Sequence, residues 1–286
     1  PGLRKPNPEE PEVFRIAERE ALQEHADLMI ATDPDSDRIG AGVICDSKAF
    51  FFTGNQIGAL LADFLSRQGS VKGKIMVTTV VTGDLGSRIV TSRGATVIHT
   101  LTGSKFVCEE MNHMEAGEFL LGYEESHGYI GGMHIRDKDG VLAAMLLCET
   151  AAWHKTQGKT LLDALEDLYQ EYGYYIDEQD SFVFEGAKGA KEMQKIMARL
   201  RSRRGSVFAP LGKPDKMLDY EKGVDELPRS NVLKFFFPNG SWVAVRPSGT
   251  EPKIKFYYCI RGKDQRQAED LYEAVQNSVE EFLRTF

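Results

Sequence analysis

Helical and strand-like segments alternate along the first hundred residues of this chain. Residues 8–23 carry apolar side chains at helical spacing, and residues 28–31 form a short apolar strand that runs directly into a polar loop. The same order then repeats, with strands near Val43, at 75–81 and at 96–100 and helices at 55–67 and 85–93. Helices that alternate with apolar strands predict α/β domains, in which the loops at strand ends commonly bind ligands.

Further along the chain, two helices are predicted at 141–154 and 161–172. The first is apolar on almost all sides, so we expect it to be deeply buried. After a boundary near Ile176 the pattern changes to strands joined by turns, and Pro238-Asn239-Gly240 indicates a hairpin. This last part has strands at 181–184, 232–237 and 242–245 and helices at 190–201 and 267–286, which together predict a smaller α+β domain.

The composition argues against several classes of partner. The formal net charge is −8, whereas binding to nucleic acid or to an anionic membrane requires a basic face. No run of eighteen apolar residues and no signal-peptide pattern occurs, so we expect no membrane partner. Four scattered cysteines without a Cys-x-x-Cys pair argue against a disulfide framework or a zinc site and favour a reducing cytoplasm: Cys45, Cys108, Cys148 and Cys259.

Three aspartates on alternate residues follow the first apolar strand. Asp33, Asp35 and Asp37 offer carboxylate oxygens that can converge on one hard cation, and the adjacent Arg38 can meet a phosphate that binds the same metal. An EF-hand does not fit, because Arg38 and Ile44 stand where that loop needs glycine and glutamate. Two alternatives stay open. One is a phosphatase with Asp33 as nucleophile and Asp35 as acid, and the other is a solvated acidic turn.

A second polar loop places hydrogen-bonding side chains between glycines, in Gly122-Tyr-Glu-Glu-Ser-His-Gly128. Glutamate and serine here can reach adjacent hydroxyls of a polyol, since one carboxylate can bridge two of them. The segment 134–140 follows and contains Lys138, which can carry a proton where its neighbours lower its pKa. The alternative is that these glutamates and this lysine are ordinary surface charges.

The third polar loop is Arg246-Pro-Ser-Gly-Thr-Glu-Pro-Lys-Ile-Lys255. Arginine presents a planar fork that matches phosphate oxygens, hydroxyl groups add donors, and Gly249 lets backbone amides approach an anion. The Walker pattern GxxxxGK is absent, so the loop does not indicate nucleotide binding. Considered alone, such an arginine-rich turn is more often structural than ligand-binding.

Together the three loops describe a metal-assisted enzyme for a phosphorylated polyol. In this order and rough spacing they resemble those of the α-D-phosphohexomutases, the family of phosphoglucomutase and phosphomannomutase, and the resemblance covers the whole chain. That family has four domains around one cleft. The resemblance implies an α/β fold class, with the end of mutase domain 2 at 1–50, a βαβ-type mixed-sheet domain 3 at 51–176 and a smaller α+β domain 4 at 177–286.

The resemblance also implies roles for the matching residues. Asp33, Asp35 and Asp37 match the Mg²⁺ ligands, and Arg38 matches a contact of the phosphoserine. Lys138 matches the proposed general acid/base of glucose-specific members, and Lys105 a further active-site lysine. The implied substrate-binding positions are Glu124, Ser126, His127 and Arg136. The implied phosphate-binding positions are Arg246, Ser248, Gly249, Thr250 and Lys255, the last being arginine in many members.

The implied reaction exchanges phosphate between the two ends of a hexose. An enzyme phosphoserine gives its phosphoryl group to the sugar, and glucose 1,6-bisphosphate is the intermediate and activator. The Gly-Tyr-Glu-Glu-Ser pattern favours interconversion of glucose 1-phosphate and glucose 6-phosphate, with phosphopentomutase and phosphomannomutase as alternatives. A phosphorylated sugar is the implied partner, and we expect a cytoplasmic monomer or weak dimer.

The nucleophile of the family has no match in this sequence. It lies in a Thr-Ala-Ser-His-Asn-Pro-like stretch, and no His-Asn-Pro occurs here, while the chain begins at Pro1 rather than at methionine. We therefore expect a fragment of a mutase that is inactive by itself. The alternative from another functional class is a non-catalytic fragment that binds sugar phosphates.

Overall fold

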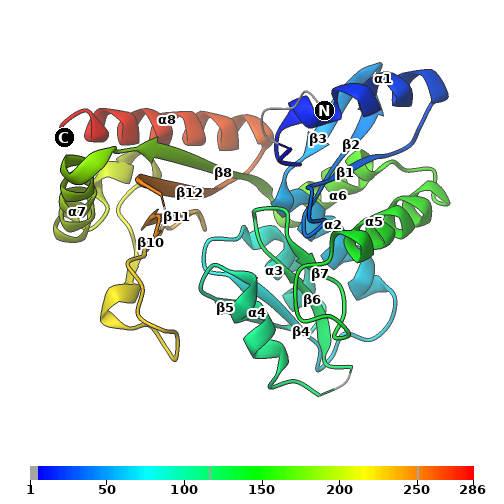
Figure 1. Ribbon diagram of the computed structural model, residues 1–286, viewed down its shortest axis with the longest axis horizontal. Helices are drawn as coiled ribbons and strands as arrows, with labels where there is room; N and C mark the ends of the chain where they lie inside the picture. The colour runs from blue at the N-terminus through cyan, green and yellow to red at the C-terminus, as the bar shows by residue number, and fades with distance from the viewer. Residues whose placement is uncertain (1–5, 116, 250) are drawn as a thin grey trace. The chain divides into compact units, whose positions relative to one another are not determined.

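The structure is a computed structural model, and it describes residues 6–115, 117–249 and 251–286 (Figure 1). The chain divides into two compact units, Pro1–Tyr172 and Gly173–Phe286. The predicted boundary near Ile176 falls inside β8 (Tyr174–Val183), the first strand of the second unit. The division into three domains, at 1–50, 51–176 and 177–286, stays a prediction.

The first unit begins with a small antiparallel layer. A 3₁₀ turn (Pro11–Phe14) leads into α1 (Arg15–Glu24), which packs with a sheet of order β1-β2-β3. Its strands are β1 (Met29–Thr32), β2 (Ile39–Cys45) and β3 (Lys48–Phe52). Phe14 is buried and its ring lies 5.0 Å from that of Phe51, which fixes the helix against the sheet. Residues 33–38, the acidic loop with Asp33, Asp35 and Asp37, therefore connect β1 to β2.

The larger part of the first unit is a mixed sheet of order β5-β4-β6-β7. The strands β4 (Ile75–Thr79), β5 (Thr96–Thr100) and β6 (Phe119–Tyr123) are parallel, and the short β7 (Tyr129–Ile130) pairs antiparallel with β6. Because β5 and β6 lie on opposite sides of β4, the connection from β4 to β5 and the connection from β5 to β6 run in opposite directions across the sheet. Ligands of such sheets bind at the carboxyl ends of the strands beside this point.

Five helices accompany this sheet: α2 (Gly54–Arg67), α3 (Asp84–Ser92), α4 (Ser104–Met111), α5 (Gly140–Lys155) and α6 (Leu161–Tyr172). The start of α2 is fixed by a capping box, in which Thr53 and Gln56 each bond the other's backbone amide. The prediction that α5 is deeply buried is wrong. It packs on α2, α6, β2 and β7 by one side only, so Val141 is 69% exposed and Met145 is 51% exposed.

The second unit is a five-stranded antiparallel sheet of order β8-β12-β11-β10-β9. Besides β8 it contains β9 (Lys216–Asp219), β10 (Leu233–Phe236), β11 (Trp242–Pro247) and β12 (Lys253–Gly262). The helices are α7 (Gly186–Arg203) and α8 (Gln265–Leu283), with 3₁₀ turns at Ser206–Leu211 (η2) and Tyr220–Lys222 (η3). Figure 1 shows α8 alongside β8 and β12.

One face of this second sheet carries the core of the unit. Buried side chains of α7, α8 and η2 meet every second residue of the strands, among them Phe235, Val243 and Phe256. The hairpin predicted at residues 238–240 joins β10 to β11, and Gly240 takes the positive φ of 85° that this turn needs. The fold class is thus confirmed as mixed α/β followed by an α+β unit.

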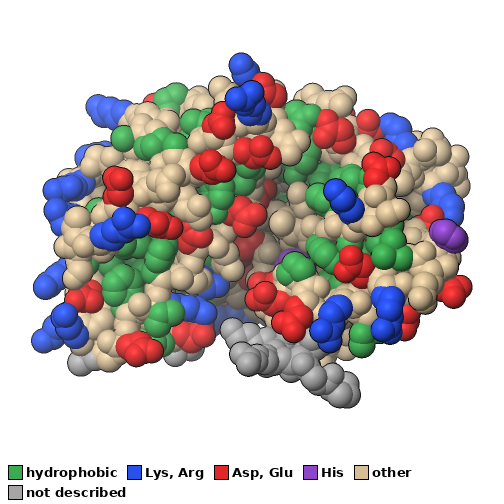
Figure 2. All heavy atoms as spheres, turned by 90° about the horizontal axis from the view of Figure 1, so that it is seen from above, with side chains coloured by type: hydrophobic (Ala, Val, Ile, Leu, Met, Phe, Trp, Pro, Cys, Tyr) green, Lys and Arg blue, Asp and Glu red, His purple; other side chains and the backbone are tan. Residues whose placement is uncertain are grey.

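The surface in Figure 2 shows acidic and basic side chains interspersed, with no continuous basic area on this face. Within the described ranges, every helix is too short or too polar to cross a lipid bilayer. In the described part of the chain no two cysteines form a disulfide, and Cys108 and Cys259 are buried.

Candidate active site

The acidic loop folds around its first carboxylate. Asp33 is 3% exposed, and its Oδ1 accepts hydrogen bonds from the backbone amides of Asp37 and Arg38, both at 3.1 Å. A positive φ of 58° at Ser36 turns the chain back toward β2. Burial raises the pKa of Asp33, but hydrogen bonds from Arg38 and Asp37 outweigh this effect, and the pKa lies below its usual value. Asp33 is therefore ionised throughout the physiological range.

The three predicted metal ligands meet at one point. One oxygen from each of Asp33, Asp35 and Asp37 lies within 4.8 Å of the others. Burial and the neighbouring Asp33 raise the pKa of Asp37, while its pairing with Lys138 opposes this rise. A cluster of carboxylates that repel one another and offer only oxygen atoms fits a hard divalent cation such as Mg²⁺. The residues present thus suit the metal that the resemblance implies.

Arg38 is held by four side chains. Its Nε donates to Asp33 at 2.7 Å and lies 3.6 Å from Asp37, and its Nη1 donates to Glu9 and Asn7, both at 3.3 Å. The contacts of Glu9 and Asn7 with Arg38 were not predicted from the sequence, because about thirty residues separate them from the arginine and no local pattern marks them. The backbone between them packs closely against Gly40, where a Cβ atom would lie 2.1 Å from the carbonyl oxygen of Pro8.

Replacing Glu9 by Gln is expected to lower the free energy of unfolding by about 0.5 kcal/mol, the usual value for a partly exposed ion pair. The neutral amide keeps the hydrogen bond to Arg38 but loses the charge attraction. Urea titration measures the change, and the difference should shrink in about 1 M salt because screening weakens the pair in the wild type. Glu10→Gln, at an exposed neighbouring residue, is the control. Equal losses of stability in Glu9→Gln and Glu10→Gln would contradict a stabilising ion pair between Glu9 and Arg38.

The acidic loop is joined directly to residues 122–128, the predicted sugar-reading loop. Arg38 and Gly128 form an isolated β-bridge, and the backbone amide of Ile39 donates to the carbonyl of His127 at 3.1 Å. His127 Nδ1 lies 2.9 Å from the Ile39 carbonyl, which can only accept, so Nδ1 carries the hydrogen. His127 is buried, and this burial lowers its pKa. Its ring thus serves the connection, and its predicted contact with a sugar stays a prediction.

Lys138 completes the connection between the loops. Its Nζ lies 2.5 Å from Asp37, and its aliphatic stem covers Gly128, where a Cβ atom would lie 2.3 Å from Lys138 Cδ. The amide of Gly140 donates to Ser36 at 2.9 Å, so the start of α5 also contacts the acidic loop. The structure therefore brings the predicted acid/base lysine to the predicted metal ligands.

Glu124 lies at the carboxyl end of β6 and is 5% exposed. Its Oε1 accepts from the amide of Gly103 at 2.7 Å, which draws the loop after β5 toward the sugar-reading loop. Gly103 has a φ of 126°, and Lys105 follows at the exposed start of α4. Ser126 is half-buried two residues beyond Glu124. The predicted residues Glu124 and Lys105 thus follow the ends of β6 and β5, the two strands that flank β4.

Arg136 is placed differently from the other predicted substrate contacts. It is exposed, and its Nη1 donates to Asn112 at 2.8 Å, just beyond the end of α4. The hydrogen bond to Asn112 explains the position of the Arg136 side chain without a ligand. A role of Arg136 in sugar binding stays a prediction.

Two threonines after β4 form a further polar group at the strand ends. Thr79 and Thr82 donate hydroxyl hydrogen bonds to Glu125 Oε2 at 3.3 and 3.1 Å, and the amide of Gly83 donates to Asn55 at 2.9 Å. These residues were not predicted from the sequence. The signal that marks them is a Thr-Gly pair directly after an apolar strand, at the edge where ligands of parallel sheets bind.

The predicted phosphate loop belongs to the second unit. Arg246 and Lys255 are direct cross-strand partners in β11 and β12, so their side chains leave the same face of the sheet. Between them, the Ser248 amide donates to Lys253, and Ser248 Oγ accepts from the Glu251 amide. Gly249 is exposed with open space around its Cα, and Thr250 lies outside the described residues. Two adjacent cations beside an open glycine form a surface that fits a phosphate.

Three family models match the chain in order. They describe the phosphoglucomutase/phosphomannomutase α/β/α domain II at residues 1–45, α/β/α domain III at 53–172 and the C-terminal domain at 183–278. A curated phosphoglucomutase of Staphylococcus haemolyticus is 35% identical over 98% of this chain and 53% of its own length. One from Staphylococcus aureus is 35% identical over 91% of this chain and 49% of its own.

Solved structures support the same fold. The exocytosis-sensitive phosphoprotein parafusin (phosphoglucomutase) of Paramecium, in its open form, matches 96% of this chain and 49% of its own with a TM-score of 0.72 and 23% identity. A phosphomannomutase-like protein of Thermus thermophilus matches 96% and 51% with a TM-score of 0.63 and 21% identity. The chain spans about half the length of the curated relatives it matches. It belongs to the phosphoglucomutase/phosphomannomutase family and matches that family's domains II to IV.

Proposed function

We propose that this chain supplies the metal, sugar and distal-phosphate sites of a mutase that interconverts glucose 1-phosphate and glucose 6-phosphate. The observation that carries the proposal is the connection of the acidic loop to the sugar-reading loop, through the Arg38–Gly128 bridge and the Asp37–Lys138 pair. A cation site, a buried carboxylate for sugar hydroxyls and a lysine for proton transfer then act on one molecule. The parent enzyme would use a phosphoserine and a glucose 1,6-bisphosphate intermediate.

Each group has a distinct task in this proposal. Asp33, Asp35 and Asp37 would hold Mg²⁺, which when bound offsets negative charge on the phosphoryl oxygens. Arg38 donates to the same oxygens and keeps its orientation through Asp33 and Glu9. Lys138 transfers the proton of the reacting hydroxyl, and its pairing with Asp37 keeps the ammonium group beside the acidic loop.

Sugar recognition rests on Glu124 with Ser126. A carboxylate that bridges two adjacent hydroxyls can accept a hexose in either of the two orientations that the reaction requires. Arg246 and Lys255 would hold the phosphate that is not reacting, and they read the anion rather than the sugar position. Pentose and mannose phosphates are the alternative substrates.

Titration calorimetry of this chain with Mg²⁺ and glucose 1-phosphate, mannose 1-phosphate and ribose 1-phosphate tests the substrate. We expect glucose 1-phosphate to bind most tightly. Glu124→Gln should weaken it about tenfold or more, the usual cost of losing a charged hydrogen bond, and leave inorganic phosphate unaffected. Glu109→Gln, at an exposed glutamate of α4, is the control. Tighter binding of mannose or ribose phosphate would overturn the choice of sugar.

A turnover assay separates the functional classes. We expect the chain to bind glucose 1-phosphate without converting it, because its sequence lacks the Ser-His-Asn-Pro stretch. Full mutase turnover by a species of 32.0 kDa would show that the essential serine is not missing. A phosphatase acting through Asp33 would instead release inorganic phosphate and form an aspartyl phosphate that Asp33→Asn abolishes.

The cellular setting follows from the same proposal. We infer that the parent protein works in a reducing cytoplasm, where its four cysteines stay reduced, as a monomer or weak dimer. Size-exclusion chromatography with light scattering at several concentrations measures its oligomeric state.

A further inference from the structure

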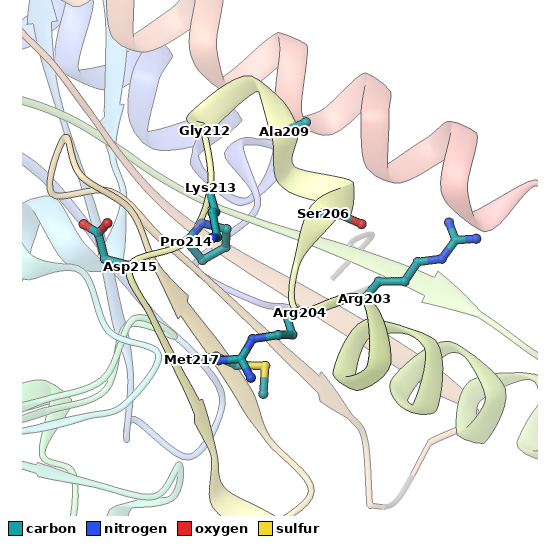
Figure 3. Close-up of a pocket in the computed structure, with 9 residues that line it drawn as sticks. All are labelled: Arg203, Arg204, Ser206, Ala209, Gly212, Lys213, Pro214, Asp215 and Met217. Atoms are coloured by element: carbon teal, nitrogen blue, oxygen red, sulfur yellow. The ribbon is translucent and has the colours of Figure 1, made fainter.

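A surface pocket of about 510 Å³ lies in the second unit, outside the loops described above. Its walls come from the end of α7, from η2 and from the segment that leads into β9 (Figure 3). The volume is within the range of small-molecule sites in proteins and several times larger than a phosphate ion needs. The residues that the argument uses are Arg203, Arg204, Ala209, Lys213, Pro214 and Met217.

The charge around this pocket is opposite to that of the whole chain. The net charge of the chain is −8, yet residues 195–216 contain seven cations and one acid: Lys195, Arg199, Arg201, Arg203, Arg204, Lys213 and Lys216 against Asp215. Arg201 is neutralised by Asp219 and Glu221. In the described part of the chain, Arg203, Arg204 and Lys213 form no ion pair and no side-chain hydrogen bond. Among the described residues, the three cations at the pocket thus have no ion-pair partner, whereas the neighbouring Arg201 has two.

The pocket also has an apolar side. Met217 and Pro214 are half-buried, and Ala209 adds a methyl group from η2. In Figure 3 the Arg204 side chain extends from the end of α7 toward Met217, while Arg203 and Asp215 extend away from the pocket centre. A methionine thioether packs well against a planar ring, and a guanidinium fork matches phosphate oxygens. The lining therefore suits a ligand with one anionic end and one apolar end.

This pocket is separate from the phosphate loop. Met217 pairs with Phe235, which pairs with Val243, and these residues share the core face of the sheet. Arg246 stands three residues beyond Val243 on the same strand, and side chains alternate between faces, so Arg246 points to the opposite face. A ligand that contacts Met217 cannot reach Arg246 through the sheet.

We propose that this pocket binds a small phosphate monoester that carries an apolar or aromatic ring, with a nucleoside monophosphate as the representative of the class. Arg204 and Lys213 hold the phosphate, and Met217 with Pro214 contacts the ring. The binding site is independent of the sugar-phosphate chemistry proposed above, because none of its residues belongs to the three loops.

Calorimetric titration of the chain with adenosine 5′-monophosphate tests the proposal, with inorganic phosphate and adenosine as the separate halves of the ligand. We expect the monophosphate to bind at this pocket more tightly than at the phosphate loop, and each half to bind the pocket more weakly. The double variant Arg204→Ala/Lys213→Ala should weaken the monophosphate more than about tenfold, since each cation makes a charged hydrogen bond. Lys191→Ala/Lys195→Ala removes two exposed cations of the same helix and should change the affinity less than about twofold.

Two further variants locate the ligand. Met217→Ser should weaken the monophosphate and leave inorganic phosphate unchanged, because only the ring contacts this side chain. Arg246→Ala should leave monophosphate binding unchanged. Equal losses of monophosphate affinity in both double variants would show unspecific charge attraction. A loss of affinity in Arg246→Ala would place the ligand at the phosphate loop. Either result would overturn the proposal. Circular dichroism of each variant confirms that it is folded.

Discussion

Replacing Asp33 by Asn is expected to weaken Mg²⁺ binding on the order of 100-fold or more, since even changes behind the ligands of a metal site cost 10- to 100-fold. Asp33 is the buried member of the three carboxylates and fixes the loop through two backbone amides and Arg38. The asparagine keeps one acceptor oxygen for those amides, so the loop retains its path but loses a charged ligand. Calorimetry with Mg²⁺, or paramagnetic resonance with Mn²⁺, measures the affinity.

The same variant should lose stability in a pH-dependent way. The pKa of Asp33 is lowered in the folded protein, so its ionised form stabilises the fold above the unfolded-state pKa. This contribution disappears as the pH falls through the lowered pKa, and the stabilities of wild type and variant should converge there. Asp46→Asn, at an exposed turn with a φ of 48° that asparagine tolerates, is the control for both measurements. Unchanged Mg²⁺ affinity in Asp33→Asn would exclude the metal site.

Replacing Gly54 by Ala is expected to lower the free energy of unfolding by about 1–3 kcal/mol, the usual cost of adding an atom to a packed interior. A Cβ atom here would lie 2.2 Å from the carbonyl oxygen of Glu125 and 2.9 Å from the amide nitrogen of His127. These are backbone atoms, so the start of α2 and the sugar-reading loop must move apart. Tyr129, which donates to the Gly54 carbonyl at 3.0 Å, must move with them.

The effect of Gly54→Ala should therefore appear in two measurements. Urea titration reports the loss of stability, and calorimetry reports weaker binding of glucose 1-phosphate because Glu124 shifts with the loop. Gly69→Ala is the matched control, since a Cβ atom there meets nothing within 4 Å and the stability should change by less than about 0.5 kcal/mol. Gly54→Ala with wild-type stability and affinity would contradict the packing described for this loop.

Local patterns in the sequence were sufficient for most elements of the fold. The strand at 96–100 and the helix at 161–172 were predicted with the observed bounds, because clear apolar periodicity ends at glycine or threonine. β12 was not predicted, since Lys253, Lys255 and Arg261 interrupt its apolar residues. The exposure of α5 also escaped prediction. A helix that is apolar on all sides carries no information about which side its neighbours cover.

The candidate site was predictable to the extent that its residues are adjacent in sequence. The three aspartates and Arg38 lie within six residues, so their convergence follows from a single turn. Asn7 and Glu9 reach Arg38 only because the segment before the 3₁₀ turn Pro11–Phe14 packs against Gly40 in β2. The burial of His127 likewise depends on its pairing with Ile39, which no local pattern indicates. Contacts between distant segments are set by tertiary packing and are therefore invisible to local periodicity.

The contacts between the acidic loop and the sugar-reading loop have a thermodynamic consequence. Any ligand that orders one loop acts, through Arg38, His127 and Lys138, on the conformational freedom of the other. Free energies of binding are linked reciprocally. If Mg²⁺ raises the affinity for a sugar phosphate by some factor, the sugar phosphate must raise the affinity for Mg²⁺ by the same factor, and the cation is released more readily once the sugar has left.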